Sequence, residues 1–192
     1  MRAWRVKVVV LIGVVLLAIP PASASASAGA IPPREWAANF CGSVVAWVSV
    51  VQKRTSAYNK VIATWKASSN KKISTIRGVV VAYVRDTTAS TDQMVLKVKR
   101  AGPPAVANGV KTQAQVNAAL AQVSAVFHQA LAKAGALPTS NPILFISKTT
   151  ALSRQITSGL SKIGDAFTAI GKISSPALDS AARTTAACKR LG

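Results

Sequence analysis

Apolar residues recur at every third or fourth position along four long segments of this sequence, and that period constrains the fold more than any other feature. The first segment starts at Arg34, and its apolar positions are Trp36, Phe40, Val44, Trp47, Val51, Tyr58, Ile62 and Trp65. This spacing places the side chains on one face of an α-helix, whereas a half-buried strand would alternate every second residue. The segment is therefore predicted to be a helix that buries one face.

A second segment with the same period starts at Lys71, after the break Ser68-Ser69-Asn70. Its stripe consists of Ile73, Ile76, Val80, Val84, Thr87, Thr91, Met94 and Val98. The stretch GVVVAYV at residues 78–84 favours a strand by residue preference, but it lies inside about thirty residues of helical period, so we expect a helix. The hydroxyls of Thr87, Ser90 and Thr91 are expected to donate to carbonyls of the preceding turn, with a small polar cavity between helices as the alternative.

Proline and glycine separate the remaining segments. Gly102-Pro103-Pro104 must end the second helix, because proline cannot donate a backbone hydrogen bond and restricts the residue before it. A third, alanine-rich segment follows Asn108-Gly109 and carries Val116, Leu120, Val123, Phe127, Leu131 and Ala134. A fourth follows Asn141-Pro142 and carries Ile146, Leu152, Ile156, Leu160, Ile163, Phe167 and Ile170.

Two local signals refine the end of the chain. Glycines inside the fourth segment lower its helix preference and predict a bend or break at Gly159, Gly164 or Gly171. Ser174-Ser175-Pro176 predicts a capped start for a short fifth helix that runs to about Cys188.

These segments together predict the fold class. Four helices of roughly 25 to 30 residues joined by short loops favour antiparallel neighbours, so we expect an all-α, up-down antiparallel bundle of four long helices plus a short C-terminal helix. The predicted organisation is a secretory signal peptide at residues 1–28, an extended lead-in at 29–34 and a single helical-bundle domain at 35–192.

The signal peptide is inferred from the three-part layout of the first 28 residues. Arg2, Arg5 and Lys7 precede an apolar run from Val8 to Ile19, and small residues suited to signal peptidase follow. The apolar run has about 12 residues, fewer than the roughly 20 that cross a membrane, although an uncleaved anchor is the alternative. Cleavage is expected after Ala24, Ala26 or Ala28. The expected location is secreted or extracellular, with or without attachment to the cell surface.

The sequence contains two cysteines, Cys41 and Cys188. In an oxidising exterior two cysteines of a small secreted protein usually pair, so we predict a disulfide between the first and last helices. A lipid anchor would need its cysteine directly after the apolar run, and Cys41 lies some twenty residues beyond it. A nucleophile would need a histidine base, and His128 is the one histidine of the sequence. A zinc site would need ligand spacings that are absent here.

Positive charge is the most unusual feature of the composition. The sequence has 24 Lys and Arg against 5 Asp and Glu, and 21 of these cations follow residue 28, which leaves a net charge of +16 after cleavage. A field of this sign attracts polyanions and says nothing of the fold. The hypothetical polyanion-binding residues are Lys53, Lys60, Lys97, Lys99 and Arg100. Expected partners are anionic envelope polymers or an anionic lipid surface, without sequence-specific nucleic-acid binding.

Catalytic chemistry is not expected. The carboxylates Glu35, Asp86, Asp92, Asp165 and Asp179 are scattered singly, and nucleotide, hydrolase and metalloprotease motifs are absent. We therefore expect a non-catalytic protein without cofactor or metal. Two alternatives remain open, a cationic membrane-interacting protein, because residues 146–174 alone resemble a membrane-active peptide, and a small-ligand carrier with an interhelical cavity. The sequence leaves the oligomeric state and the physiological role open.

The layout loosely resembles small secreted helical proteins of high-GC Gram-positive bacteria. The likeness is carried by the leader, by Trp36 and Cys41, by the sequence KRAGPPAVANG at the end of the second helix, by the alanine-rich helix after it and by Ala187-Cys188. Families of this kind are largely uncharacterised. The resemblance therefore implies a compartment and an all-α fold, and it transfers no active residue.

Overall fold

The computed structural model describes residues 29–69, 72–171 and 175–191, and between residues 160 and 171 it describes the side chain of residue 161 alone. The predicted signal peptide, residues 1–28, lies outside this description. The described part is all-α, with helices α1 (Pro33–Ala67), α2 (Ile73–Arg100), α3 (Gly109–Gly135), α4 (Pro142–Gly171), α5 (Pro176–Thr184) and α6 (Ala186–Lys189). Residues 78–84 lie within α2, so helical period outweighed strand preference there.

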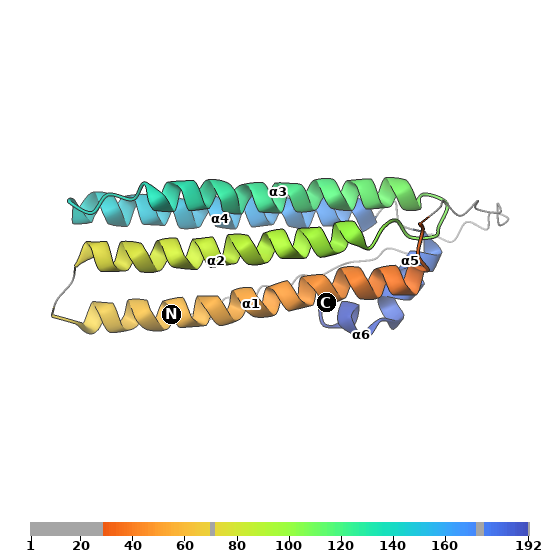
Figure 1. Cartoon of the computed structure of the whole chain (residues 1–192), viewed down its shortest axis with the longest axis horizontal. Helices are drawn as coiled ribbons and strands as arrows, with labels where there is room; N and C mark the ends of the chain where they lie inside the picture. The colour runs from red at the N-terminus through yellow and green to blue at the C-terminus, as the bar shows by residue number, and fades with distance from the viewer. Residues whose placement is uncertain (1–28, 70–71, 172–174, 192) are drawn as a thin grey trace.

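The four long helices run antiparallel, each beside its neighbour in the sequence (Figure 1). The short helices α5 and α6 fold back onto α1 near its start. This arrangement confirms the predicted up-down bundle. Among the described residues, α4 packs closely along α3 and only loosely against α1, so the bundle has an open seam between its first and last long helices.

The C-terminal tail differs from its prediction. One fifth helix was expected between Pro176 and Cys188, but the backbone of Thr185 is extended, with φ −80° and ψ 123°, and divides the tail into α5 and α6. The Thr185 amide and hydroxyl both donate to the Ala181 carbonyl, at 3.0 Å and 2.7 Å, which ties Thr185 to the last turn of α5. The start of α5 is as predicted, since the Ser175 hydroxyl accepts from the Leu178 amide.

The core forms two clusters along the bundle. The cluster beside α5 contains Trp36, Ala37, Met94, Val98, Val116, Leu120, Val123, Phe127, Leu178 and Ala181. The cluster toward the opposite end contains Ile76, Val80, Val84, Ala130, Ala134, Leu137, Phe145 and Leu152. Beyond Cys41, the apolar stripe of α1 is only half-buried, because that part of α1 faces the open seam.

The predicted apolar face of α4 was wrong by one residue at the start of the helix. Ile146 was expected in the stripe, but it is exposed, whereas Phe145 is buried. Phe145, Thr149, Leu152 and Ile156 follow the spacing four, three, four, so they share the inward face, and Ile146 lies about 100° further round the helix.

Two of the three hydroxyls singled out in α2, those of Thr87 and Thr91, form the bonds expected of them. Thr87 donates to the Tyr83 carbonyl and Thr91 donates to the Thr87 carbonyl, both at 2.8 Å. Thr91 also accepts a hydrogen bond from the Trp47 indole Nε1 at 2.9 Å. A second indole bond joins Trp36 Nε1 to Gln113 Oε1 at 2.7 Å. These bonds fix the register of α1 against α2 and α3.

Close backbone approaches explain two glycines. A Cβ on Gly109 would lie 1.8 Å from the Pro104 carbonyl oxygen, so the start of α3 can pack on the proline loop only through glycine. A Cβ on Gly159 would lie 2.6 Å from the side chain of Val126 on α3. The helix α4 continues to Gly171, so the break expected at its glycines is absent from its described backbone.

The N-terminal lead-in is tied to the proline loop. The Ile31 amide donates to the Pro103 carbonyl at 2.9 Å, and the Ala105 amide donates to the Ile31 carbonyl at 2.7 Å. Helix α1 begins at Pro33, slightly earlier than expected, because proline is well suited to the first helical position.

Candidate functional site

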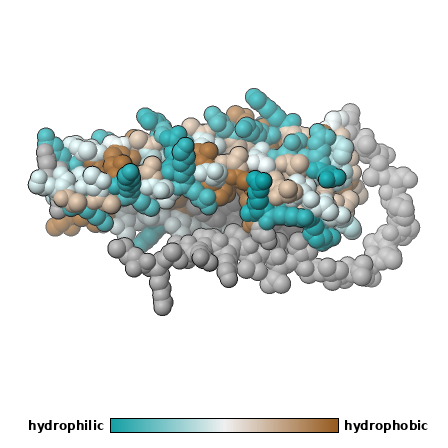
Figure 2. Space-filling view, turned by 90° about the horizontal axis from the view of Figure 1, so that it is seen from below, coloured by the Kyte–Doolittle hydropathy of each residue, from teal (hydrophilic) through white to brown (hydrophobic). Residues whose placement is uncertain are grey.

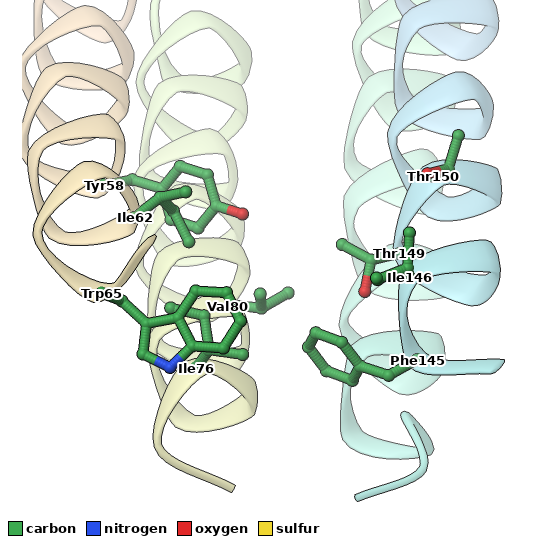
Figure 3. Close-up of a pocket in the computed structure, with 9 residues that line it drawn as sticks. All are labelled: Tyr58, Ile62, Trp65, Ile76, Val80, Phe145, Ile146, Thr149 and Thr150. Atoms are coloured by element: carbon green, nitrogen blue, oxygen red, sulfur yellow. The ribbon is translucent and has the colours of Figure 1, made fainter. Parts of the chain in front are cut away.

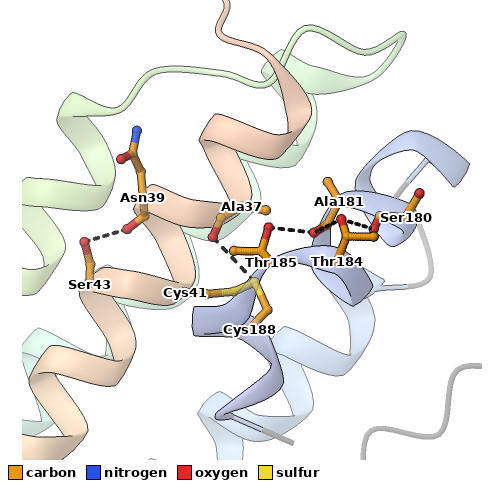
Figure 4. The surroundings of a disulfide bond; sticks show 9 residues. All are labelled: Ala37, Asn39, Cys41, Ser43, Ser180, Ala181, Thr184, Thr185 and Cys188. Carbon is orange, nitrogen blue, oxygen red and sulfur yellow. Dashed lines mark hydrogen bonds between the residues drawn. A yellow bond between two sulfur atoms is a disulfide. The ribbon is translucent and has the colours of Figure 1, made fainter.

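Cys41 and Cys188 form the predicted disulfide, with their Cα atoms 5.0 Å apart across a sequence separation of 147. Figure 4 shows α6 lying against the first part of α1, with the two cysteines bridging the helices. The bond fixes the tail that covers this part of α1. It also removes both thiols from nucleophilic chemistry, and it is compatible with an extracellular, oxidising location.

The five predicted polyanion-binding residues are all exposed, but the structure divides them into two groups. Lys53 and Lys60 lie on α1, and Lys97, Lys99 and Arg100 lie in the last turn of α2. Thr55 Oγ1 lies 2.9 Å from the Tyr83 hydroxyl, which places Lys60 beside the start of α2. At 1.5 Å per residue, Lys60 and Lys97 are therefore roughly 30 Å apart along the rod.

Carboxylates in the described structure neutralise little of this positive surface. Asp86 pairs with Arg54 and with Arg85, and Asp92 pairs with His128. None of the five predicted residues forms an ion pair with a described carboxylate. Figure 2 shows hydrophilic residues spread along the face of the rod seen from below, with apolar residues between them. The five predicted residues thus lie in two separate groups and do not converge on one pocket.

His128, the one histidine of the sequence, is exposed, and it has a partner that the sequence did not reveal. His128 Nε2 lies 3.0 Å from Asp92 Oδ2, and the Ser124 hydroxyl donates to Asp92 Oδ1 at 2.6 Å. Ser124 and His128 are four residues apart on α3 and therefore share a face. This spacing is the one sign of the cluster that the sequence contains.

The order of these three residues differs from that of a hydrolytic triad. A serine nucleophile is activated when a histidine nitrogen accepts its proton and a carboxylate holds the other side of that histidine. Here the Asp92 carboxylate stands between Ser124 and His128, and it accepts the hydrogen bond of the serine hydroxyl itself. The cluster joins α2 to α3. In the described part of the chain, no three His, Cys, Asp or Glu residues are placed to hold a metal ion.

The open seam contains a groove of about 160 Å³ at the end of the rod away from the disulfide. Figure 3 shows α1 and α2 on one side of it and α4 on the other. Its lining is uncharged and consists of Tyr58, Ile62, Trp65, Ile76, Val80, Phe145, Ile146, Thr149 and Thr150. Trp65 Nε1 and Thr149 Oγ1 are buried without a hydrogen-bond partner in the described structure.

Two tyrosines lie on the α1–α2 side of this groove. The rings of Tyr58 and Tyr83 are 4.9 Å apart between centroids. Burial raises the pKa of the Tyr58 hydroxyl above its ordinary value of 10.0, and the neighbouring Tyr83 raises this pKa further. Figure 3 shows the Tyr58 hydroxyl pointing toward the space between the helix pairs. The groove therefore offers a neutral hydroxyl at physiological pH.

No family model, curated protein or solved structure matches this chain. The resemblance to secreted bacterial proteins therefore remains a prediction. Within the described ranges, none of the helices is both long and apolar enough to cross a membrane. Function is accordingly inferred from the residues and their geometry.

Proposed function

We propose that this protein is secreted and associates with anionic polymers of the cell envelope, without catalysis and without a dedicated binding pocket. One observation supports this proposal most directly. Exposed lysines and arginines lie on widely separated parts of the rod, and they have no described carboxylate partners. A long polymer can contact both groups of cations at once, whereas a small anion could contact only one.

The physical basis is the release of counterions. When a cation neutralises a phosphate or carboxylate of a polyanion, condensed counterions return to solution, so the binding constant falls steeply as salt is added. The same field increases the rate at which protein and polymer meet. Neither effect requires a shaped pocket, which agrees with the spread of the cations over the surface.

Binding to defined polymers tests this proposal. The purified protein with its disulfide intact would be titrated with linear polyphosphate and with polyglutamate, and neutral dextran would serve as the control. We expect both polyanions to bind at low salt and to lose about a hundredfold in affinity by about 0.2 M salt, with no binding to dextran. Absence of binding at low salt, or an affinity that does not change with salt concentration, would contradict the proposal.

The groove favours a second candidate function, the binding of a small neutral molecule. Carriers of drug-sized ligands use pockets of roughly 300–1,000 Å³, whereas a dry cavity of about 150 Å³ accepts benzene. A groove of about 160 Å³ therefore fits one ring or a short alkyl group. The unpaired Trp65 Nε1 supplies a donor for a ligand oxygen.

Phenol is a suitable probe for this second candidate. Titration of phenol should shift the NMR signal of the Trp65 indole N–H and leave that of Trp36, which is bonded to Gln113, in place. The shift should be independent of salt, because the lining is uncharged. Equal shifts of both indoles would show that phenol does not occupy the groove.

A further inference from the structure

One end of the rod exposes a concentrated apolar patch at the start of α4. Ile143 is 81% exposed, Ile146 is 63% exposed and Leu144 is 43% exposed. We call these three residues the apolar tip. Figure 1 places the start of α4 at the same end of the rod as the end of α1 and the start of α2, and Figure 2 shows hydrophobic surface at that end. Single exposed aliphatic residues are ordinary, but three within four positions form a contiguous surface.

The apolar tip continues into the groove. Ile146 lines the groove together with Phe145 and Trp65, so apolar surface extends from the end of the rod into the open seam. The seam is covered by α5 and α6 only near the start of α1, at the opposite end of the rod. The two ends of the molecule therefore present different chemistry.

Exposed lysines lie at the same end of the rod as the apolar tip. Lys66 lies in the last turn of α1, Lys72 is the residue before α2, and Lys148 lies in the second turn of α4. The described carboxylates are elsewhere, because Glu35 lies in the first turn of α1, Asp86 and Asp92 lie along α2 and Asp179 lies in α5. This end is thus positively charged and apolar together.

We propose that this end of the rod docks onto an anionic lipid bilayer. Ile143, Leu144 and Ile146 enter the boundary between headgroups and acyl chains, and the three lysines bind lipid phosphates. Basic surfaces with exposed aliphatic side chains bind anionic bilayers through charge attraction and through insertion of the apolar side chains. The insertion persists at salt concentrations that screen the charges. The binding of lysines to lipid phosphates rests on the proposed function, whereas insertion of the apolar tip is independent of it.

Bilayer docking predicts an orientation for the molecule. The long helices stand away from the membrane plane, with the end of α1 and the start of α2 near the lipid and the disulfide far from it. The proposal differs from insertion of α4 along its length, because the inserting residues are confined to its first turn and a half.

Matched variants test the proposal. Ile143→Ser combined with Ile146→Ser removes the two most exposed residues of the apolar tip, and Leu96→Ser combined with Val110→Ser removes two exposed aliphatic residues elsewhere, which are 49% and 59% exposed. Each variant would be sedimented with vesicles of phosphatidylcholine containing phosphatidylglycerol at about 0.15 M salt. We expect the tip variant to lose about tenfold in vesicle affinity and the control variant to stay within about twofold of the parent protein.

Two further measurements separate the possible causes. Ile143→Ser alone avoids the groove lining, and an expected loss of about threefold in vesicle affinity keeps the test valid if the double variant folds poorly. Polyphosphate affinity should be equal in all these variants, because no charge has changed. Vesicles of phosphatidylcholine alone should bind much more weakly than the anionic ones.

Three outcomes would overturn the inference. Equal vesicle affinity of the tip and control variants would leave charge as the only attraction. Equal binding to neutral and anionic vesicles would remove the role of the lysines. Binding to polyphosphate without binding to anionic vesicles would overturn bilayer docking and leave the proposed function standing, whereas the absence of polyphosphate binding would contradict the proposed function itself.

Discussion

Thr91 has no exposed surface and joins two helices through one hydroxyl. It donates to the Thr87 carbonyl within α2 and accepts from the Trp47 indole of α1. Thr87 is also buried, but its hydroxyl donates only to the Tyr83 carbonyl of its own helix. The two threonines occupy neighbouring turns of one stripe and differ in what their hydroxyls hold together.

Valine substitution should separate these two roles. Thr91→Val leaves Trp47 Nε1 without an acceptor, so we expect a loss of about 1–2 kcal/mol in unfolding free energy. Thr87→Val keeps the side-chain shape and leaves no donor unpaired, so its effect should stay within about 0.5 kcal/mol. Urea denaturation measures both. Equal effects would show that the indole bond contributes nothing.

Gly109 is required by a close approach of the backbone. Gly109→Ala places a methyl group against the Pro104 carbonyl, and we expect it to lower the unfolding free energy by about 2–3 kcal/mol. Gly78→Ala is the matched control, because nothing lies within 4 Å of its Cβ position on α2. Its effect should be a gain of up to about 1 kcal/mol from helix preference, again measured in urea. A Gly109→Ala variant as stable as the parent would contradict the packing described.

Tyr58 should give the protein a specific response to alkaline pH. Its pKa is raised in the folded state by burial and by Tyr83, so the neutral phenol stabilises the fold fully below about pH 10, and this contribution is lost as pH rises through the raised pKa. Absorbance of the phenolate should show Tyr58 ionising above its ordinary value of 10.0, and Tyr58→Phe should abolish that component. Ionisation of Tyr58 at or below pH 10 would disprove its burial.

At the scale of the elements, the long helices could be predicted because each carries a complete apolar stripe between proline or glycine breaks. The division of the tail at Thr185 could not, because the extended backbone there is set by packing of α6 on α1. The choice of Phe145 over Ile146 likewise depends on where α3 lies. An apolar stripe predicts the period of a helix. Which residues of the first turn face the core depends on the position of the neighbouring helix.

The disulfide joins elements that are otherwise held by few buried residues. Leu178 and Ala181 of α5 are buried, as is Thr185 between the two helices, whereas Cys188 of α6 is half-buried. Closing a loop of 147 positions is worth about 5 kcal/mol in lost unfolded-state entropy. The tail is therefore the element most dependent on its covalent link.

Removal of the disulfide should release the tail first. Cys41→Ser combined with Cys188→Ser should lower the unfolding free energy by up to about 5 kcal/mol, and amide hydrogen exchange should speed up in α5 and α6 before it does in α3. A reductant should bring the parent protein to the stability of this variant and leave the variant unchanged. If the reductant left the unfolding free energy of the parent protein unchanged, the contribution assigned to the disulfide would be wrong.

At the scale of the whole molecule, the sequence determines the charge but not its distribution. The excess of cations could be counted before the fold was known, and the pairing of Cys41 with Cys188 could be predicted from their number. The groove, the apolar tip and the link from Asp92 to His128 required the helices to be placed side by side. The groove and the link from Asp92 to His128 combine residues from different helices that no spacing in the sequence connects. The apolar tip lies on α4 alone, and its exposure depends on which face of α4 packs on α3.

Charge neutralisation in two separate regions tests the distributed surface most directly. Lys53→Gln with Lys60→Gln removes two charges from α1, and Lys97→Gln with Lys99→Gln removes two from the end of α2. The measurement is the slope of log affinity for linear polyphosphate against log salt for each pair and for all four together. We predict equal reductions for the two pairs and about twice that reduction for the four substitutions together. Loss of binding from one pair, with no change from the other, would reveal a localised site and contradict the account.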